Sequence, residues 1–200
     1  MLGRNDPTPS VREAIRNALE HEKNRALIGA YWLALGLSRD LEGRATLRAA
    51  LASSADPRQR MYAATGLALV GDPESASLVR ESLGVEANSA LKVAYGAALG
   101  QFGMVQDAER LASVLADLKE PALQGLAASA LAFHGTREAL GTLRIAASEE
   151  KRAPVRRAAA IEGLAMMLGE TPPYTFSLVS RQANYTVFSD WMKGLLQVSL

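Results

Sequence analysis

Hydrophobic residues recur along this chain at the spacing of α-helices. Five segments, 26–36, 61–71, 93–103, 125–135 and 159–169, are apolar almost all round, and each ends in a glycine. Helices that are apolar on every side are buried between neighbours, and a glycine supplies the left-handed conformation that terminates a helix. We therefore predict helices that end at Gly36, Gly71, Gly103, Gly135 and Gly169.

Four stretches with a narrower apolar stripe alternate with these segments. They cover residues 45–51, 76–83, 108–118 and 138–147. The five glycines follow one another at nearly equal intervals, so the repeating unit is a pair of antiparallel helices. One pair cannot bury its apolar faces alone, but stacked pairs share a continuous core. We predict an all-α fold, an α-α superhelix of about five helical-hairpin repeats over residues 1–169.

This pattern is similar to HEAT repeats, in particular to the short bacterial type that also occurs in phycobilin lyases. In that type an acid lies in the turn, a basic residue opens the next helix, and small and apolar residues lead to a glycine. The acids here are Glu22, Asp56, Glu86, Glu120 and Glu150. The basic residues are Arg25, Arg60, Lys92 and Arg157, with Gln124 in the fourth unit. The resemblance implies an α-solenoid, but it implies little about function, because repeat folds carry many functions.

The two ends of the chain differ from the repeats. Residues 1–3 resemble the end of a helix whose body is absent, so we expect that the chain begins mid-repeat, as a fragment of a longer protein. Ser10 or Thr8 ahead of Val11, with Glu13 three residues after Ser10, predicts the capped start of a following helix. Residues 170–200 are expected to form a linker and a capping helix. The apolar stripe of that helix consists of Val187, Phe188, Trp191, Met192, Leu195 and Leu196.

Composition narrows the classes of function. The formal net charge is +1, from 22 basic and 21 acidic residues, which counts against a nucleic-acid partner on the usual criterion of a basic excess. The chain has no cysteine, which excludes disulfides and thiolate chemistry. No apolar run reaches the roughly 20 residues of a membrane span. The first ten residues lack a signal-peptide core; the compartment stays open, and is cytoplasmic if the chain is complete.

The residues that usually carry chemistry are scattered. His21 and His134 lie in different repeats without a metal-ligand neighbour. The glycines follow the repeat and do not cluster into a phosphate-binding loop. We therefore predict no catalytic, cofactor-binding or metal-binding residues, and no enzymatic activity.

Basic residues form two regular columns. One is the helix-opening set given above, and the other contains Arg12, Arg48, Arg80 and Arg144. Each member of the second column has an acid at position i − 6: Asp6, Glu42, Glu74 and Glu138. We predict that acids in the turns pair with basic residues of the same or the next layer, which resembles the acid–arginine ladder of HEAT proteins. The alternative is a basic groove for an acidic partner, which the matched acids weaken.

Aromatic residues suggest where a partner would bind. Tyr31, Trp32, Tyr62 and Tyr95 lie on helices that are expected to line the concave side. Such residues are typical interface anchors, although packing between layers explains them equally well. The partner-binding residues that we predict are Tyr62, Tyr95, Arg60 and Lys92.

The sequence favours an interaction scaffold that binds another protein on its concave face. One alternative, implied by the resemblance to phycobilin lyases, is a lyase or isomerase acting on a bilin-type cofactor. Another is nucleic-acid binding, as in HEAT-like alkylpurine DNA glycosylases, which the near-neutral charge makes the weaker alternative.

Overall fold

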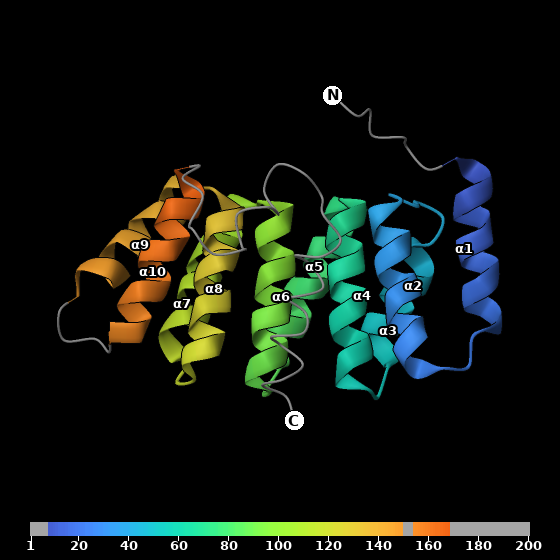
Figure 1. Cartoon of the computed structure of the whole chain (residues 1–200), viewed down its shortest axis with the longest axis horizontal. Helices are drawn as coiled ribbons and strands as arrows, with labels where there is room; N and C mark the ends of the chain where they lie inside the picture. Colours follow the sequence, from blue (N-terminus) through green and yellow to red (C-terminus); the bar gives the residue numbers. More distant parts are fainter. Residues whose placement is uncertain (1–7, 150–153, 169–200) are drawn as a thin grey trace. The chain divides into compact units, whose positions relative to one another are not determined.

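Every regular element in the described part of the chain, residues 8–149 and 154–168 of a computed structural model, is helical (Figure 1). This confirms the all-α prediction for those residues. The elements there are α1 (Pro9–His21), α2 (Arg25–Leu37), α3 (Arg44–Ser53), α4 (Pro57–Val70), α5 (Pro73–Val85), α6 (Ser89–Phe102), the 3-10 turn η1 (Val105–Asp107), α7 (Ala108–Asp117), α8 (Pro121–His134), α9 (Arg137–Ser148) and α10 (Pro154–Met167).

The chain divides into two compact units, Met1–Ser82 and Leu83–Leu200, and the junction falls inside α5. In the first unit α4 packs against α2 and α3, and α1 packs against α2. In the second unit α8 packs between α6 and α10, and α7 and α9 also contact it. Each unit is therefore built from helical hairpins. The predicted capping helix and the boundary at residue 170 lie outside the described residues.

Close backbone contacts hold the core helices of each unit together. A Cβ atom on Gly36 of α2 would lie 2.7 Å from the carbonyl oxygen of Gly66 in α4, and one on Gly100 of α6 would lie 2.4 Å from that of Ala130 in α8. The two pairs have the same separation in sequence, since 66 − 36 equals 130 − 100. The same helix-to-helix contact thus occurs once in each unit, and it requires small residues because a larger side chain would meet backbone.

The predicted end of α2 is wrong. The helix continues through Gly36 to Leu37, and the left-handed residue that follows is Arg39, with φ 51°. Gly36 is needed for its approach to α4 and not for a turn. The predicted ends at Gly71, Gly103 and Gly135 are confirmed, with φ of 77°, 65° and 68°. Gly169 lies outside the described residues.

With this correction the repeat becomes regular. The left-handed residues Arg39, Gly71, Gly103 and Gly135 recur at a constant interval, because 71 − 39, 103 − 71 and 135 − 103 all equal 32. Two residues whose numbers differ by a multiple of 32 therefore hold equivalent positions, and we call this relation the repeat register. The repeat register, rather than the uneven spacing of the glycines, identifies which side chains correspond between repeats.

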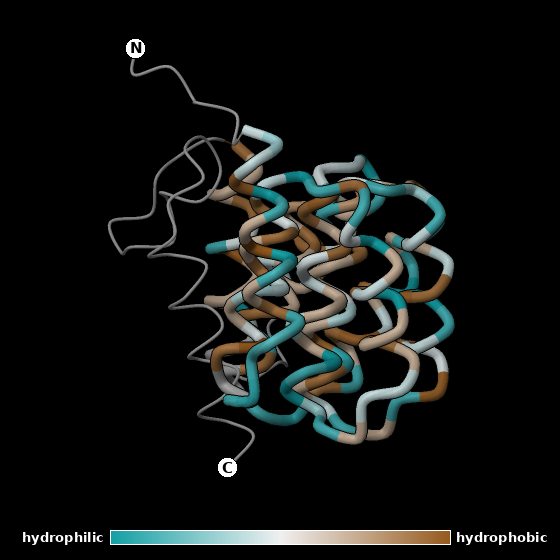
Figure 2. The backbone as a smooth tube through the Cα atoms, turned by 90° about the vertical axis from the view of Figure 1, so that its right-hand side faces the viewer, coloured by the Kyte–Doolittle hydropathy of each residue, from teal (hydrophilic) through white to brown (hydrophobic). Residues whose placement is uncertain are grey.

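Local sequence explains where the helices begin. Side chains of Asp56, Asn88 and Thr136 accept hydrogen bonds from backbone amides in the first turns of α4, α6 and α9. Of the two predicted caps, Thr8 is the residue that precedes α1, without a side-chain capping bond, and Ser10 lies inside the helix, so the capping box of Ser10 and Glu13 is wrong. In Figure 2, α1 lies nearest the viewer, and hydrophilic and hydrophobic residues alternate along its turns.

Candidate interaction surfaces

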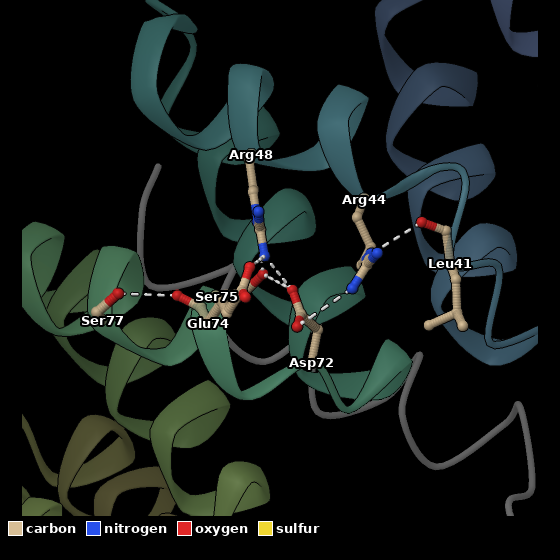
Figure 3. A network of polar contacts seen from close by, with 7 residues as sticks. All are labelled: Leu41, Arg44, Arg48, Asp72, Glu74, Ser75 and Ser77. Atoms are coloured by element: carbon tan, nitrogen blue, oxygen red, sulfur yellow. Dashed lines mark hydrogen bonds and ion pairs between the residues drawn. The ribbon is translucent and has the colours of Figure 1, made fainter.

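An acid–arginine network joins α3 to the turn between α4 and α5 in the first unit (Figure 3). The guanidinium of Arg48 donates to Asp72, lies 3.3 Å from the carboxylate of Glu74 and donates to the Ser75 hydroxyl at 3.0 Å. Arg44 lies 3.4 Å from Asp72 and donates to the Leu41 carbonyl at 2.8 Å. The network connects two successive hairpins of this unit.

The same arrangement occurs one repeat earlier. Arg16 of α1 makes ion pairs of 2.7 Å with Asp40 and 2.8 Å with Glu42. In both repeats an arginine at position i pairs with acids at positions i + 24 and i + 26. The sequence predicted pairing within the same or the next layer, and for Arg16 and Arg48 the acids belong to the next layer.

Arg16 holds the position in the ion-pair column that the sequence predicted for Arg12. The Nε of Arg12 donates instead to the Ser38 carbonyl at 2.9 Å. The signal that finds Arg16 is the repeat register, because Arg16 is equivalent to Arg48.

Burial and charge act in opposite directions on the carboxylates of this network. Asp72 is 5% exposed, and burial alone raises the pKa of its carboxyl. Hydrogen bonds from Ser75 and Arg48 and the charges of Arg48 and Arg44 outweigh burial, so the pKa of Asp72 lies below its ordinary value. The arginines and acids cancel one another locally. These arginines therefore stabilise the hairpins, and they do not support a basic groove.

In the second unit, two side chains at the helix-opening positions donate hydrogen bonds to backbone carbonyls. Gln124, which is buried, donates from Nε2 to the Leu118 carbonyl at 2.9 Å and to that of Lys119 at 3.4 Å. Arg157 donates from Nε to the Ala147 carbonyl at 3.3 Å. The accepting carbonyls lie at the ends of α7 and α9, where a helix leaves its last carbonyls without intrahelical partners. Gln124 is therefore a neutral residue at the helix-opening position, and it makes the same kind of hydrogen bond to a helix end as Arg157 does.

The four predicted partner-binding residues lie on two helices. Arg60 and Tyr62 belong to α4 in the first unit, and Lys92 and Tyr95 belong to α6 in the second. Tyr95 is only 1% exposed, so its side chain packs in the core of this structure. Packing was the alternative that the sequence left open. Arg60 and Lys92 are half-buried, and their role in binding stays a prediction.

Tyr62 presents part of its ring on the surface. The ring lies over Gly29 of α2, where an added Cβ would come within 2.4 Å of Tyr62 Cδ2. Burial raises the pKa of the Tyr62 phenol, and the charge of Arg58 opposes this rise. The tyrosine is therefore both a packing residue between α2 and α4 and a half-exposed aromatic side chain.

An apolar stripe on α2 extends this surface. Leu27 is 47% exposed, Ala30 is exposed, and Tyr31 and Ala34 are half-buried. These residues follow one another at intervals of three, one and three, so they share one face of the helix. The stripe cannot be recognised in the sequence, because α2 is apolar all round and its exposed side cannot be told from its buried sides. We call Leu27, Ala30, Tyr31, Ala34 and Tyr62 the α2 surface.

His134 has a structural role in the second unit. Its ring is 5% exposed and bridges the Met104 carbonyl, 2.7 Å from Nε2, and the Thr136 hydroxyl, 3.0 Å from Nδ1. The imidazole therefore connects the turn after α6 to the turn after α8.

Among the described residues no group of three or more histidine and carboxylate side chains is placed to hold a metal ion. The helices of that part of the chain are also too short or too polar to cross a membrane. A scan against models of known protein families and a search of curated proteins each return no match for this chain.

Proposed function

We propose that this chain is a non-catalytic scaffold that binds another protein through the α2 surface. The observation that supports this proposal is the exposure of Leu27 and Ala30 next to the half-buried Tyr31, on the helix whose Gly29 lies under the Tyr62 ring. Contiguous apolar surface costs free energy in water, and aromatic side chains with a polar tip are frequent anchors at protein interfaces.

The proposal includes a HEAT-like superhelix. The constant interval between the left-handed residues supports it, as do contacts between core helices at the same sequence separation in each unit. A stack of hairpins offers a long surface without any need for catalytic groups. Small residues at the contacts allow each hairpin to accept the next.

Site-specific photo-crosslinking tests the proposal. A photoreactive phenylalanine analogue at Tyr31 is expected to capture one discrete protein in cells of the source organism. The same analogue at Ala49, an exposed position on α3 of the same unit, is the matched control and is expected to capture nothing discrete. Identical products at both positions, or none at Tyr31, would contradict the proposal.

The captured protein is then purified, and its binding is measured directly. Leu27→Asp combined with Tyr31→Ala is expected to weaken binding at least tenfold, since two anchors of about 1 kcal/mol or more are lost. Visible absorbance of the purified chain and a salt-dependent shift of duplex DNA are measured alongside. A bound chromophore would favour the lyase or isomerase acting on a bilin-type cofactor, and a DNA complex would favour nucleic-acid binding. Either result would contradict the scaffold proposal.

A further inference from the structure

The apolar stripe of the α2 surface lies on the side of α2 that faces away from α4. Gly29 and Gly36 mark the side that meets α4, because an added Cβ atom would lie 2.4 Å and 2.7 Å from atoms of that helix. Leu27 and Ala34 each precede one of these glycines by two residues, which is about 200° around a helix. The stripe and the α4 contact therefore occupy opposite sides of α2.

The repeat register gives the counterparts of the stripe in α8. The differences 123 − 27, 126 − 30, 127 − 31 and 130 − 34 all equal 96, which is three times 32. Leucine occupies the first position and alanine the last in both helices. The α8 residues are at most 7% exposed, and they are Leu123, Leu126, Ala127 and Ala130. The side that is open on α2 is therefore covered on α8.

A helix with a glycine at the contact covers this side in each unit (Figure 1). Gly100 of α6 lies against Ala130, the counterpart of Ala34, and Gly36 of α2 lies against Gly66, which is also a counterpart of Ala34 because 66 − 34 equals 32. An added methyl group would meet backbone at both glycines, so the approach requires a residue without a Cβ atom.

The covering helix runs in the same direction as the helix that it covers in the first unit. Gly29 of α2 meets Tyr62 of α4, and the later Gly36 meets the later Gly66. These contacts state the chemistry of the element that fits the open stripe. It is an apolar helix, parallel to α2, with a glycine at the position that faces Ala34.

We infer that the stripe of the α2 surface binds such an α-helix, supplied by the partner protein. The inference rests on the proposed function and adds the structure of the partner's binding segment. Strand addition does not apply, because α2 bonds its main-chain groups within the helix. A second copy is disfavoured, because its Gly36 and Gly100 are already covered by α4 and α8.

A peptide that copies α6, residues 89–102, tests the inference on the full chain. In the chain this helix covers the α8 side that corresponds to the stripe. A short helix is marginal in water, so the synthetic peptide carries a staple on the side away from Gly100. Fluorescence anisotropy of the labelled peptide is expected to show saturable binding to the full chain.

Substitution in the peptide tests the need for glycine. Gly100→Leu is expected to weaken binding about tenfold or more, because the added side chain would meet the backbone at Ala34. Leucine favours a helix over glycine, so a less helical peptide would not explain the loss. Gln101→Leu adds the same side chain at a position that is exposed in the chain, and is expected to leave binding unchanged. Equal binding of the Gly100→Leu and unsubstituted peptides would overturn the inference.

Photo-crosslinking locates the bound peptide and its direction. A photoreactive phenylalanine analogue replaces Ala30, the counterpart of Tyr62, whose ring lies over Gly29. It is expected to attach to the peptide near Val93, the counterpart of Gly29, since 93 − 29 equals two repeats of 32. The analogue at Ala49 on α3 is the control and is expected to attach to nothing. Attachment at the C-terminal end of the peptide would overturn the parallel arrangement.

The remaining outcomes separate this inference from the proposed function. A discrete protein captured in cells, without glycine-dependent binding of the peptide, would overturn the inference and leave the proposed function in place. Glycine-dependent peptide binding without a cellular partner would support a helix-binding stripe and contradict the proposed function. Cross-links from residue 30 to a second copy, or to the same chain, would overturn the inference in favour of that occupant.

Discussion

At the scale of single residues, buried polar side chains tie one hairpin to the next. Asp72 is almost fully buried, yet it stays charged because Ser75 and Arg48 donate to it. His134 and Gln124 make corresponding links to backbone carbonyls in the second unit. A buried polar group without its partner costs free energy, so these links make the turns specific as well as stable.

The first prediction concerns the pH dependence of the Asp72 network. The folded-state pKa of Asp72 lies below its ordinary value of 3.8, so the carboxylate stabilises the fold at neutral pH. This contribution is lost as the pH falls below 3.8 and through the folded-state pKa. Asp72→Asn is expected to lower the free energy of unfolding by about 1–3 kcal/mol at pH 7 and by less near pH 3, measured by urea denaturation. Equal loss at both pH values would contradict this. Glu81→Gln, an exposed carboxylate of α5, is the control.

The second prediction concerns the amide of Gln124. Gln124→Ala removes the donor for the Leu118 and Lys119 carbonyls, and is expected to lower the free energy of unfolding by about 1–3 kcal/mol. Gln106→Ala, at an exposed position in η1 of the same unit, is expected to change it little. Urea denaturation of both variants provides the measurement, and equal stability of the two would assign Gln124 no capping role.

At the scale of elements, small residues set how closely the core helices approach. Gly36 and Gly100 are each met by backbone of the next core helix, which cannot move aside as a side chain can. Apolar alanines and leucines surround these contacts, and Leu35, Leu67, Leu99 and Leu131 are fully buried. The core helices are therefore apolar all round because they contact other helices on several sides.

The third prediction uses two glycines of the second unit. Gly100→Ala places a methyl group 2.4 Å from the Ala130 carbonyl oxygen and is expected to destabilise the fold by about 1–3 kcal/mol. Gly141→Ala on α9 meets nothing within 4 Å and is expected to stabilise the helix by about 0.5–1 kcal/mol. Thermal denaturation compares the two, and a change of the same sign in both would show that the helices do not approach as closely as described.

At the scale of the whole molecule, the repeat register makes a prediction about the proposed superhelix. Ala49, Glu81, Ser113 and Ile145 hold equivalent exposed positions on α3, α5, α7 and α9. Because the chain has no cysteine, pairs of introduced cysteines can carry spin labels without background.

The fourth prediction is that distances from residue 49 increase at every step, to residues 81, 113 and 145. Adjacent packed helices are separated by about 8–10 Å, so each additional repeat is expected to add roughly that distance or more. Pulsed dipolar spectroscopy measures all three pairs. A closed bundle would bring residue 145 back towards residue 49, and that outcome would rule out the superhelix.

The sequence alone determined the helical class of the described residues and the helix ends at Gly71, Gly103 and Gly135. Hydrophobic spacing is a local property, and a glycine such as Gly71 or Gly103 ends a helix through its own backbone freedom. It also predicted that arginines and turn acids pair within the same or the next layer, because both residue types recur with the repeat.

Only the tertiary structure decided what each repeated residue does. Gly36 resembles the terminal glycines in sequence, but contact with Gly66 makes it a packing residue. Tyr62 and Tyr95 look alike in the sequence, and burial separates them. The exposed side of α2 depends on which neighbours pack against it. The sequence of a helix that is apolar all round does not show which side is exposed, because exposure depends on the elements that pack against the helix.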